Sequence, residues 1–600
     1  MNFLMNFLRK YWIWLLIAFG VIFIAFVVTH AQTPRQCSVG EVPSCTVPTN
    51  PPVSPPLPPS TATMDGPAEL PRIYIKSNVS DTPSPGVIIH VKAGTENAAY
   101  AAAKCGDTLM LDPNSQWPQP SFTKNCDNAH WITIRPDVSD LLLPPEHSRL
   151  TPCYAGIASL SARPSYPCSS LVRVMPRFIL TGNQHVTVSG SYHRFIGIEN
   201  LQMPGTGLTR VFWQVTGSHI VFDRGWTHGG PTDEATHGFY LDGSSYVALI
   251  DSYNTDFHCK SPGLCSDAQV VSGISASGPY KITNNFLEAS GEAVLFGGGI
   301  SSIRPADIEV TRNHFFKSLI WNPGHPSYFG TQFTTKNHFE LKDGQRVLFE
   351  GNIIENNWGG FSQSGFAILL TPKNLGAIVK DVTIRYSVIK GVSGAFQIAN
   401  VAQSTTGIVS GGGLNYSIHD IIIDNSPPQY CYKCSGEFMQ INGLTAEPLT
   451  NVSIKHITYA GPPATTSGGM MFMGPAVNVS IVDSIIDVGK YGPWSIGGTT
   501  NCAYNKNGPL TKLNACFVPY TVTGNVLPRG KACPYCFVAG VAQWPAGNFY
   551  PTDNAGVGYV NLVGGDYHLT SASPYKGKAT DGKDPGADID AVLKAIAGVL

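Results

Sequence analysis

Four acidic side chains in the middle of the chain have the chemistry of a cation site. Asp256, Glu288, Glu292 and Glu355 supply carboxylate oxygens, and hard oxygen ligands of this kind bind calcium. Calcium is therefore the one cofactor that the sequence predicts. The alternative is that these residues are the ordinary polar positions of solvent-facing strands.

A second group of residues has types suited to holding a charged polymer. The segment 317–345 combines aromatic and charged side chains, and a long loop of this kind beside an extended surface can form one wall of a groove. The alternative is a long surface loop that has no part in binding. The polar segment 256–269 is either part of a site or a stapled turn. The residues predicted to contact substrate are Trp321, Tyr328, Lys336, Glu340, His258 and Lys390.

A repeated element must position these residues. Around Phe349 the chain has apolar residues two places before and four and five places after, and the pattern recurs at steps of 27 to 39 residues. The alternation is typical of strands, and Asn or a small residue falls where the chain must bend. Repeats of this length predict a solenoid, here an all-β parallel β-helix. The other repeat positions are Phe222, Ile250, Ile282, Val310, Ile384, Ile418, Ile454 and Ile481.

In a β-helix, equivalent positions on successive coils stack about 4.8 Å apart. Counting six residues from each repeat position places Asp256 and Glu288 side by side on the outer surface, with Glu292 close behind. The residue after each repeat position forms a second outward column that contains Asp251 and Arg385. Both columns change from acidic to basic along the middle coils.

The repeat is preceded by an Ala-rich helix over 95–105 and by Gly106-Asp107-Thr108 with an apolar strand. This combination resembles the right-handed parallel β-helix superfamily that includes pectate lyases and chondroitinase-B-like polysaccharide lyases. The resemblance covers residues 73 to 487 and is specific for the fold. It implies β-elimination on a uronic acid, in which a cation neutralises the carboxylate and a base removes the neighbouring proton.

The run from Lys342 to Asn352 is similar to the Lys…Asn coil of chondroitinase-B-like lyases. That similarity implies Lys342 as the base, Arg385 as the acid, and Asp256, Glu288 and Glu355 as cation ligands. A glycoside hydrolase is less favoured. Asn254-Thr255-Asp256 matches the first motif of polygalacturonases, but the Asp-Asp pair that should follow is missing.

The ends of the chain predict export. Residues 11–28 are apolar and uncharged after Arg9 and Lys10, which fits either an uncleaved membrane anchor or a cleaved signal peptide. Both place the remainder outside the cytoplasm, membrane-anchored or secreted. The predicted segments are the anchor or signal (1–31), a Pro-rich linker (32–70), an N-terminal cap with irregular first coils (71–185), regular coils (186–490), and Cys-containing C-terminal coils closed by a terminal helix (491–600).

The 14 cysteines fall mostly in close pairs, which in an exported chain predicts local disulfides. Zinc is the alternative for the two Cys-x-x-Cys pairs. Four Asn-x-Ser sequons, at Asn78, Asn415, Asn451 and Asn478, fit repeat phasing better than glycosylation. The disulfide candidates are Cys105, Cys126, Cys153, Cys168, Cys259, Cys265, Cys431, Cys434, Cys502, Cys516, Cys533 and Cys536.

Composition narrows the function classes. The formal net charge is −1 and only 13% of the residues are charged, so no nucleic-acid partner is indicated. We expect a monomeric β-helix that binds, and as a lyase cleaves, an acidic polysaccharide along a groove. The alternative is a non-catalytic carbohydrate-binding or adhesion protein at the cell surface.

Overall fold

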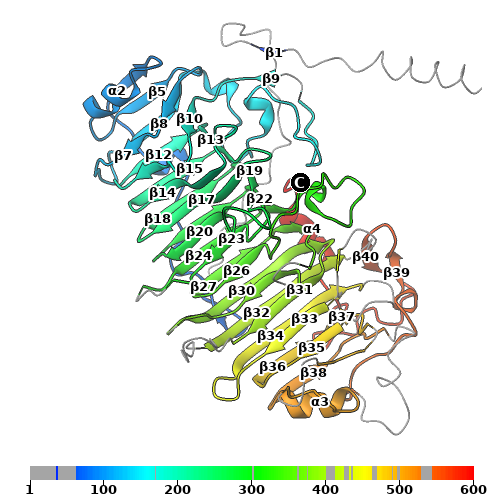
Figure 1. Cartoon of the computed structure of the whole chain (residues 1–600). Helices are drawn as coiled ribbons and strands as arrows, with labels where there is room; N and C mark the ends of the chain where they lie inside the picture. Colours follow the sequence, from blue (N-terminus) through cyan, green and yellow to red (C-terminus); the bar gives the residue numbers. More distant parts are fainter. Residues whose placement is uncertain are drawn as a thin grey trace, which may run out of the picture.

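The computed structural model describes residues 36–37, 62–168, 171–299, 303–360, 364–374, 376–400, 412–424, 432–433, 437–461, 469–489, 491–495, 501–528 and 544–600. Parallel strands stack coil on coil into an elongated solenoid (Figure 1). Each regular coil contributes one strand to each of three faces, called here the first, second and third face. The predicted right-handed parallel β-helix is confirmed.

The strands pair in parallel along every face, and three long strands serve the first and second faces together. The first face contains β4 (Ile88–Val91), β5 (Thr108–Leu111), β8 (Ile132–Pro136), β12 (His193–Ile196), β15 (Ser218–Asp223), β18 (Ser245–Ile250), β21 (Tyr280–Thr283), β24 (Ala306–Thr311), β27 (Gly344–Glu350), β30 (Ile378–Lys390), β32 (Gly412–Asp424), β34 (Leu449–Tyr459), β36 (Ala476–Val482) and β38 (Tyr520–Thr523). The second face contains β6 (Gln116–Pro118), β10 (Arg177–Leu180), β13 (Glu199–Gln202), β16 (Trp226–His228), β19 (Tyr253–Phe257), β22 (Phe286–Ala289), β25 (His314–Phe316), β28 (Ile353–Glu355), the later parts of β30, β32 and β34, and β37 (Ile485–Ile486). The third face contains β7 (Ser121–Phe122), β11 (Val186–Val188), β14 (Leu208–Val215), β17 (Glu234–Asp242), β20 (Gln269–Ser275), β23 (Val294–Phe296), β26 (Phe339–Leu341), β29 (Phe366–Leu370), β31 (Gly394–Ala399), β33 (Glu437–Asn442) and β35 (Gly469–Phe472).

The remaining elements are short. A parallel pair joins β1 (Gln36–Cys37) to β9 (Leu171–Val172). Two antiparallel pairs are β2 (Met64–Asp65) with β3 (Ala68–Glu69), and β39 (Tyr559–Asn561) with β40 (Asp566–Leu569). Within the described ranges the α-helices are α2 (Glu96–Ala102), α3 (Pro509–Cys516) and α4 (Ile589–Ile596). Single 3-10 turns occupy Val79–Asp81, Asp140–Leu142, Pro152–Tyr154, Leu319–Trp321 and Ala555–Val557.

The repeat pattern around Phe349 predicts the register with one exception. Phe349 pairs with Val310 on one side and Ile384 on the other. In the coil of β18, however, Leu249 and not Ile250 lies opposite both Phe222 and Ile282. The predicted phase is therefore wrong by one residue there, and Ile250, not Asp251, belongs to the second outward column.

Amide side chains fix the corner between the first and second faces. Asn313 Nδ2 donates to Asn352 Oδ1 at 3.1 Å, and Asn285 Nδ2 donates to Asn313 Oδ1 at 3.0 Å. Their carbonyl oxygens also accept backbone N–H groups of the preceding coil, as in Asn313 N to Asn352 Oδ1 at 2.8 Å. The ladder thereby satisfies backbone donors that the bend removes from the sheet, which confirms the predicted role of these residues.

Of the two predicted terminal helices, one lies elsewhere than the sequence predicts. The predicted N-terminal helix is confirmed as α2, whose Tyr100 packs edge-on against Phe122 of the core at 5.1 Å. The C-terminal helix α4 does not close the far end. It lies on the side of the solenoid against β30 and β32, while α3 lies at the far end beside the Phe472–Phe517 contact of 4.6 Å (Figure 1).

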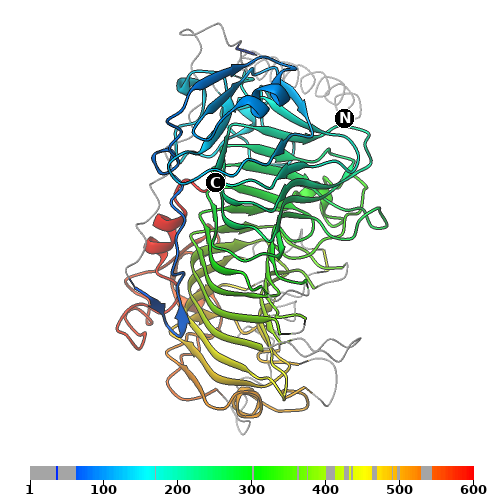
Figure 2. The ribbon, with the colours of Figure 1, turned by 90° about the vertical axis from the view of Figure 1, so that its left-hand side faces the viewer.

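Two segments from the ends of the described chain run along the same side of the solenoid (Figure 2). The N-terminal strap, residues 62–85, begins inside the predicted linker, yet it pairs Asp65 with Arg385 and His419. The C-terminal strap comprises residues 579–600, and its Asp581 forms an ion pair with Lys455. Near its end, Val599 O accepts a hydrogen bond from Arg149 at 2.7 Å. Residues 62–70 are thus part of the folded body.

Four of the predicted disulfides are present: Cys105–Cys126, Cys153–Cys168, Cys259–Cys265 and Cys502–Cys516. The pairs Cys431/Cys434 and Cys533/Cys536 lie outside the described residues, as do the apolar segment 11–28 and the Pro-rich run. Within the described part of the chain, no helix has the length and apolar character to span a bilayer.

Candidate functional site

A cleft of ≈620 Å³ opens over the third face between β14 and β26. The volume lies in the range of about 300–1,000 Å³ that is usual for ligand sites. Strand pairing sets the spacing of its walls, since Val211 lies opposite His237 and His237 opposite Gln269 on successive coils. The charged and polar residues of the lining are Arg210, Thr236, His237, Ser266, Asp267, Gln269 and Lys342.

Buried and partly buried charged side chains lie along one side of this cleft. Glu292 Oε1 is 3.4 Å from Lys336 Nζ, and Glu292 Oε2 accepts from Gln269 Nε2 at 2.7 Å. Lys336 also pairs with Asp267, while Lys342 Nζ lies 3.6 Å from Glu340 Oε1. The two glutamates are almost fully buried. The lysines retain limited exposure, so the cations rather than the carboxylates face the solvent.

Burial sets the protonation of the groups near the cleft. It raises the pKa of Glu340 to about 7, because desolvation and the nearby Glu292 carboxylate outweigh the charge of Lys342. The Glu292 carboxyl is also desolvated, but Lys336 and Lys342 hold its pKa below the usual value. Desolvation lowers the pKa of His237 to about 4. At neutral pH the His237 imidazole in the cleft is therefore neutral. Of the two neighbouring carboxyl groups, Glu340 and not Glu292 is the one that can be protonated.

Two glycines allow the turn that carries Lys342 to approach β23. Gly297 and Gly298 have φ of +82° and +98°, a region that favours glycine. A Cβ on Gly297 would lie 2.3 Å from Asp343 N, and one on Gly298 would lie 3.0 Å from the Lys342 side chain. Larger residues here would move Lys342 away from the cleft.

The predicted calcium ligands are not brought together as one set. Asp256 and Glu288 do lie side by side on the second face, but the guanidinium of Arg163 is inserted between them. Its Nη2 is 2.5 Å from Asp256 Oδ1, and its Nε is 2.9 Å from Glu288 Oε1. A fixed cation thus already neutralises this carboxylate pair, which does not fit a calcium site.

The other two predicted ligands have separate partners. Glu292 belongs to the buried ions of the cleft, and Glu355 accepts from His314 at 3.0 Å and lies 3.4 Å from Lys390. Among the described residues, the clusters with three metal-type ligand atoms close together are Glu234 with Cys259 and Cys265, and His456 with Asp483 and Asp581. The first contains a disulfide, and neither includes a predicted ligand.

The candidate acid Arg385 is not in the cleft with Lys342. It lies on the first face, where Nε is 2.6 Å from Glu350 Oε2 and Nη1 is 2.6 Å from Asp65 Oδ2. The guanidinium therefore holds the N-terminal strap. The structure places Lys336 and Glu340 near Lys342, and Lys390 apart from them on the second face.

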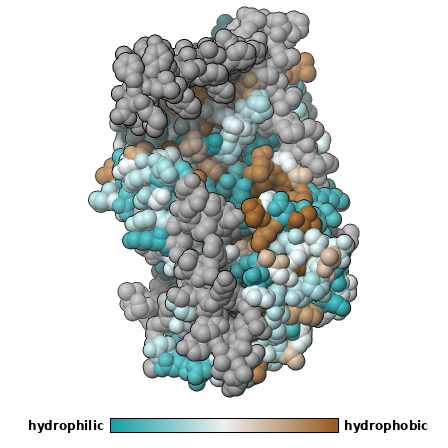
Figure 3. Space-filling view, turned by 90° about the vertical axis from the view of Figure 1, so that its right-hand side faces the viewer, coloured by the Kyte–Doolittle hydropathy of each residue, from teal (hydrophilic) through white to brown (hydrophobic). Residues whose placement is uncertain are grey.

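The aromatic residues predicted to contact substrate form a small core. Trp321 is 1% exposed and His258 is fully buried, with its ring stacked 4.0 Å from Phe333. Tyr328 retains partial exposure. The segment that carries them folds onto the body instead of lining an open groove. Figure 3 shows hydrophobic residues gathered near the middle of one side of the molecule among hydrophilic ones.

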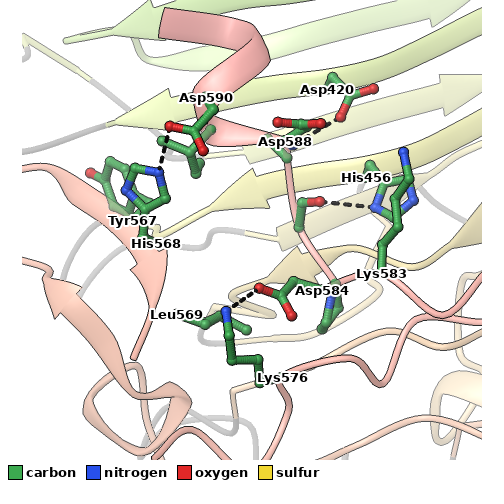
Figure 4. A pocket seen from close by; sticks show the side chains of 14 residues that line it. Asp420, His456, Tyr567, His568, Leu569, Lys576, Lys583, Asp584, Asp588 and Asp590 are labelled. Carbon is green, nitrogen blue, oxygen red and sulfur yellow. Dashed lines mark hydrogen bonds and ion pairs between the residues drawn. The ribbon is translucent and has the colours of Figure 1, made fainter. Parts of the chain in front are cut away.

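A smaller cleft of ≈270 Å³ lies between the C-terminal strap and β32 and β34 (Figure 4). Several of its charged and polar groups already have partners. Lys576 contacts Asp584 at 2.9 Å, Asp588 N donates to Asp420 at 2.9 Å, and His456 Nδ1 lies 2.9 Å from Gly586 O. These contacts attach the strap, and we assign no ligand to this cleft.

Sequence reasoning missed Arg210 and His237, and it left the segment 256–269, which contains Asp267 and Gln269, open as part of a site or a turn. They lie on or beside the strands of the third face, whereas the repeat pattern marks the first face and the corner after it. Finding them would have required the alignment of the third-face strands from coil to coil, which the repeat pattern does not provide. The spacing of 32 residues between His237 and Gln269 matches the repeat, but the apolar pattern around these two residues is weak.

No family model matches the sequence, and no curated protein matches it significantly. The chain is similar in structure to pectate lyase Pel9A, with 11% identity, 84% of this chain and 93% of that chain covered, and a TM-score of 0.29. It is similar to the PL6 family alginate lyase AlyGC, with 12% identity over 85% of this chain and 57% of that one, and a TM-score of 0.34. It is also similar to the PL6 family polysaccharide lyase Pedsa3628 from Pseudopedobacter saltans, with 13% identity, 78% and 92% covered, and a TM-score of 0.35. These likenesses concern the fold alone.

Proposed function

We propose that the cleft over the third face binds an acidic polysaccharide and cleaves it by β-elimination. The observation that carries this proposal is that Arg210 and Lys342 line one open cleft. A guanidinium can bind a uronate carboxylate through two parallel hydrogen bonds. The cleft runs across successive coils, so a linear polymer can contact several of them.

The chemistry assigned to each group follows its position. Arg210 neutralises the uronate carboxylate and so makes the neighbouring C–H more acidic. Lys342, as the neutral amine, removes that proton as the base while the glycosidic C–O bond breaks and a C=C bond forms, and the leaving oxygen takes a proton from the solvent in the open cleft. His237, kept neutral by its lowered pKa, forms a hydrogen bond with a sugar hydroxyl. Calcium and Arg385 have no part in this scheme.

A non-catalytic binding module is the second candidate, and one observation favours it. Lys342 Nζ already lies 3.6 Å from Glu340 Oε1. An ammonium group held by a carboxylate suits the binding of an anion better than the removal of a proton. Both candidates use the same cleft, and they differ only in turnover.

We infer that the protein acts as an exported monomer. The disulfides support export, because such bonds persist in oxidising compartments. Polysaccharides of the cell surface or surroundings are then the accessible partners.

The test uses the full chain, purified oxidised, with alginate, pectate and glycosaminoglycans in calcium or in chelator. Unsaturated sugar ends produced by elimination absorb ultraviolet light. A rise that Lys342→Ala abolishes, and that the exposed control Lys373→Ala and the chelator leave unchanged, establishes the lyase. Binding that Arg210→Ala weakens, without any absorbance, leaves the binding module. Neither binding nor absorbance with any of these polymers refutes both.

A further inference from the structure

His237 lines the cleft over the third face, where its side chain is half-buried. We propose that Gln269 and Glu292 orient this imidazole as a hydrogen-bond acceptor, so that the cleft selects sugar units whose facing hydroxyl is free and excludes units that are O-acylated there. The inference rests on the proposed binding of an acidic polysaccharide in this cleft. It adds a rule for which chemical forms of that polymer bind.

Three side chains occupy equivalent positions on successive coils of the third face. His237 of β17 lies opposite Gln269 of β20. Glu292 lies two residues before Val294, which is opposite Val271 of β20. Equivalent positions on neighbouring parallel strands lie about 4.8 Å apart, with their side chains on the same face. The register therefore brings the imidazole, the amide and the carboxylate into one row.

The carboxylate fixes the orientation of the amide. Burial opposes the ionisation of Glu292, but the charges of Lys336, at 3.4 Å, and Lys342 hold its pKa below the usual value. An ionised carboxylate only accepts hydrogen bonds, and Gln269 Nε2 donates to Glu292 Oε2 at 2.7 Å. The reversed amide would place two oxygens against each other. Gln269 Oε1 is therefore directed away from Glu292 and is the atom available to His237.

The amide in turn sets the tautomer of the imidazole. Burial lowers the pKa of His237 to about 4, and the interaction with Gln269 partly offsets this, as an acceptor does because it stabilises the protonated ring. Nδ1 is the ring nitrogen shielded from solvent, so we assign it to Gln269, at a contact looser than a full hydrogen bond. Such contacts tighten when a substrate binds. A neutral ring that donates through Nδ1 carries no proton on Nε2.

The Nε2 atom of His237 is thereby left as an acceptor on the cleft side. Unlike Nδ1, it is not shielded from solvent, and none of the described residues bonds to it. A free sugar hydroxyl can donate to this lone pair. An O-acetyl group has no proton to donate, and it would leave the acceptor desolvated and unpaired. O-acetylation does not change the uronate carboxylate that Arg210 binds, so this selection can be measured separately from the binding of charge.

The experiment uses the full chain labelled with 15N-histidine, together with alginate, polygalacturonate and chemically O-acetylated forms of both. Long-range 1H–15N spectra at neutral pH identify the protonated ring nitrogen of His237, whose signals His237→Phe removes. We expect the proton on Nδ1. Calorimetry should show that O-acetylation weakens binding about tenfold, the size of one hydrogen bond. His237→Phe keeps a ring but no acceptor, and it should abolish this difference.

A second pair of variants tests the positioning role of the amide. Gln269→Met should weaken binding of the free polymer about threefold to tenfold, and His237 should then show both tautomers. The matched control is Gln397→Met on β31, where the amide bonds Gln440 at 3.0 Å outside the cleft. This control should change neither the tautomer nor the affinity.

Three results would overturn the proposal: a proton on Nε2 of His237 in the wild type, equal affinity for free and O-acetylated polymer, or a preference that persists in His237→Phe and so reflects shape alone. The wild-type spectrum decides the orientation even where a variant does not fold. If no polymer binds in either form, the proposed function fails and this inference fails with it. If the free polymer binds through Arg210 without selection, this inference alone fails.

Discussion

At the scale of single residues, Arg163 occupies the place between Asp256 and Glu288 where the sequence predicts a calcium ion. The guanidinium bonds both Asp256 and Glu288, and it lies 5.6 Å from the centre of the Trp321 ring. All of these groups are nearly or fully buried. Removal of one partner from a buried ion pair leaves an uncompensated charge, which costs much more than the pair itself contributes.

We therefore predict that Arg163→Ala lowers the free energy of unfolding by about 3–5 kcal/mol. It should also create a calcium response, because Asp256 and Glu288 are then free to bind a cation. Thermal unfolding with calcium and with chelator measures both effects, and the wild type should show no difference between the two. A calcium-dependent midpoint in the wild type would contradict this account. The control Arg135→Ala, which loses an ion pair to the exposed Asp140, should cost at most about 1 kcal/mol.

The residue scale also shows what the sequence could predict. Apolar residues occupy both Leu249 and Ile250, so periodicity alone could not choose the phase of that coil. The strand pairing then shifts between Asn254 and Phe257, and Asp256 has φ of +61°. Asp256 reaches Glu288 through this irregularity and not through the regular spacing. Arg163, which is 125 residues from Glu288, has no local pattern that points to its partner.

At the scale of elements, the N-terminal strap is attached by a charged clamp. His419 lies 3.1 Å from Asp65 and 2.7 Å from Asp420. Burial disfavours the imidazolium, but hydrogen bonds to both carboxylates outweigh this and raise the pKa of His419 to about 9. The Asp65 carboxyl is also desolvated, yet the His419 hydrogen bond and the charges of His419 and Arg385 lower its pKa to about 2.

These shifts predict how the strap responds to pH. A raised histidine pKa contributes stability that is complete below its unfolded value of 6.5 and is lost as pH rises through 9. The lowered pKa of Asp65 contributes stability above its unfolded value of 3.8, which is lost as pH falls toward 2. Strap attachment should be strongest between about pH 4 and 6.5.

Hydrogen exchange of residues 62–75, corrected for the intrinsic dependence on pH, measures this attachment. We expect protection to fall between pH 6.5 and 9 in the wild type. His419→Gln should remove that change while leaving the coils protected. Protection that stays constant over this range would show that the clamp does not control the strap.

A second amide ladder, at the start of the first-face strands, accounts for three of the four sequons. Asn415 donates to Asp381 at 2.8 Å, Asn451 to Asn415 at 2.9 Å, and Asn478 to Asn451 at 2.7 Å. Each of these asparagines has positive φ, near +60°, a conformation that Asn tolerates. The Nδ2 atom that a glycan would modify is the donor in every step.

Asn451→Ala should therefore destabilise the protein by about 2 kcal/mol, through two lost hydrogen bonds and a strained backbone. Asn451→Gly relieves the backbone and should cost less than the alanine variant. Chemical unfolding of the two variants separates the contributions. Equal losses would show that the backbone conformation is not strained. Mass spectrometry after secretion from a eukaryotic host should find Asn451 unmodified.

At the scale of the whole molecule, both straps lie across the same coils. The N-terminal strap contacts β21 through the 3.4 Å bond from Lys281 Nζ to Ile75 O, and it reaches β32 at His419. The C-terminal strap runs from His456 of β34 to Arg312 beyond β24. In a solenoid each repeat contacts only its neighbours, and the straps add contacts between coils that are not adjacent.

We predict that Arg312→Met loosens the C-terminal strap. Arg312 donates to Ala595 O at 2.5 Å and to Ala597 O at 2.6 Å, and methionine keeps much of the packing while removing these bonds. Hydrogen exchange in residues 589–600 should rise, whereas exchange in β36 and β38 should not. The matched control is Lys594→Met on the exposed side of α4. Equal increases in both variants would argue against the Arg312 contacts as the attachment.

The paired straps also limit how this protein could lengthen in evolution. Solenoids commonly grow by duplication of a coil, which adds about 4.8 Å to the stack. Between β21 and β34, an extra coil would separate Asp65 from Arg385 or Asp581 from Lys455 unless both end segments gained residues at the same time. The two segments thus act as a ruler for this part of the stack, and variation in coil number among relatives should be confined to the coils outside it.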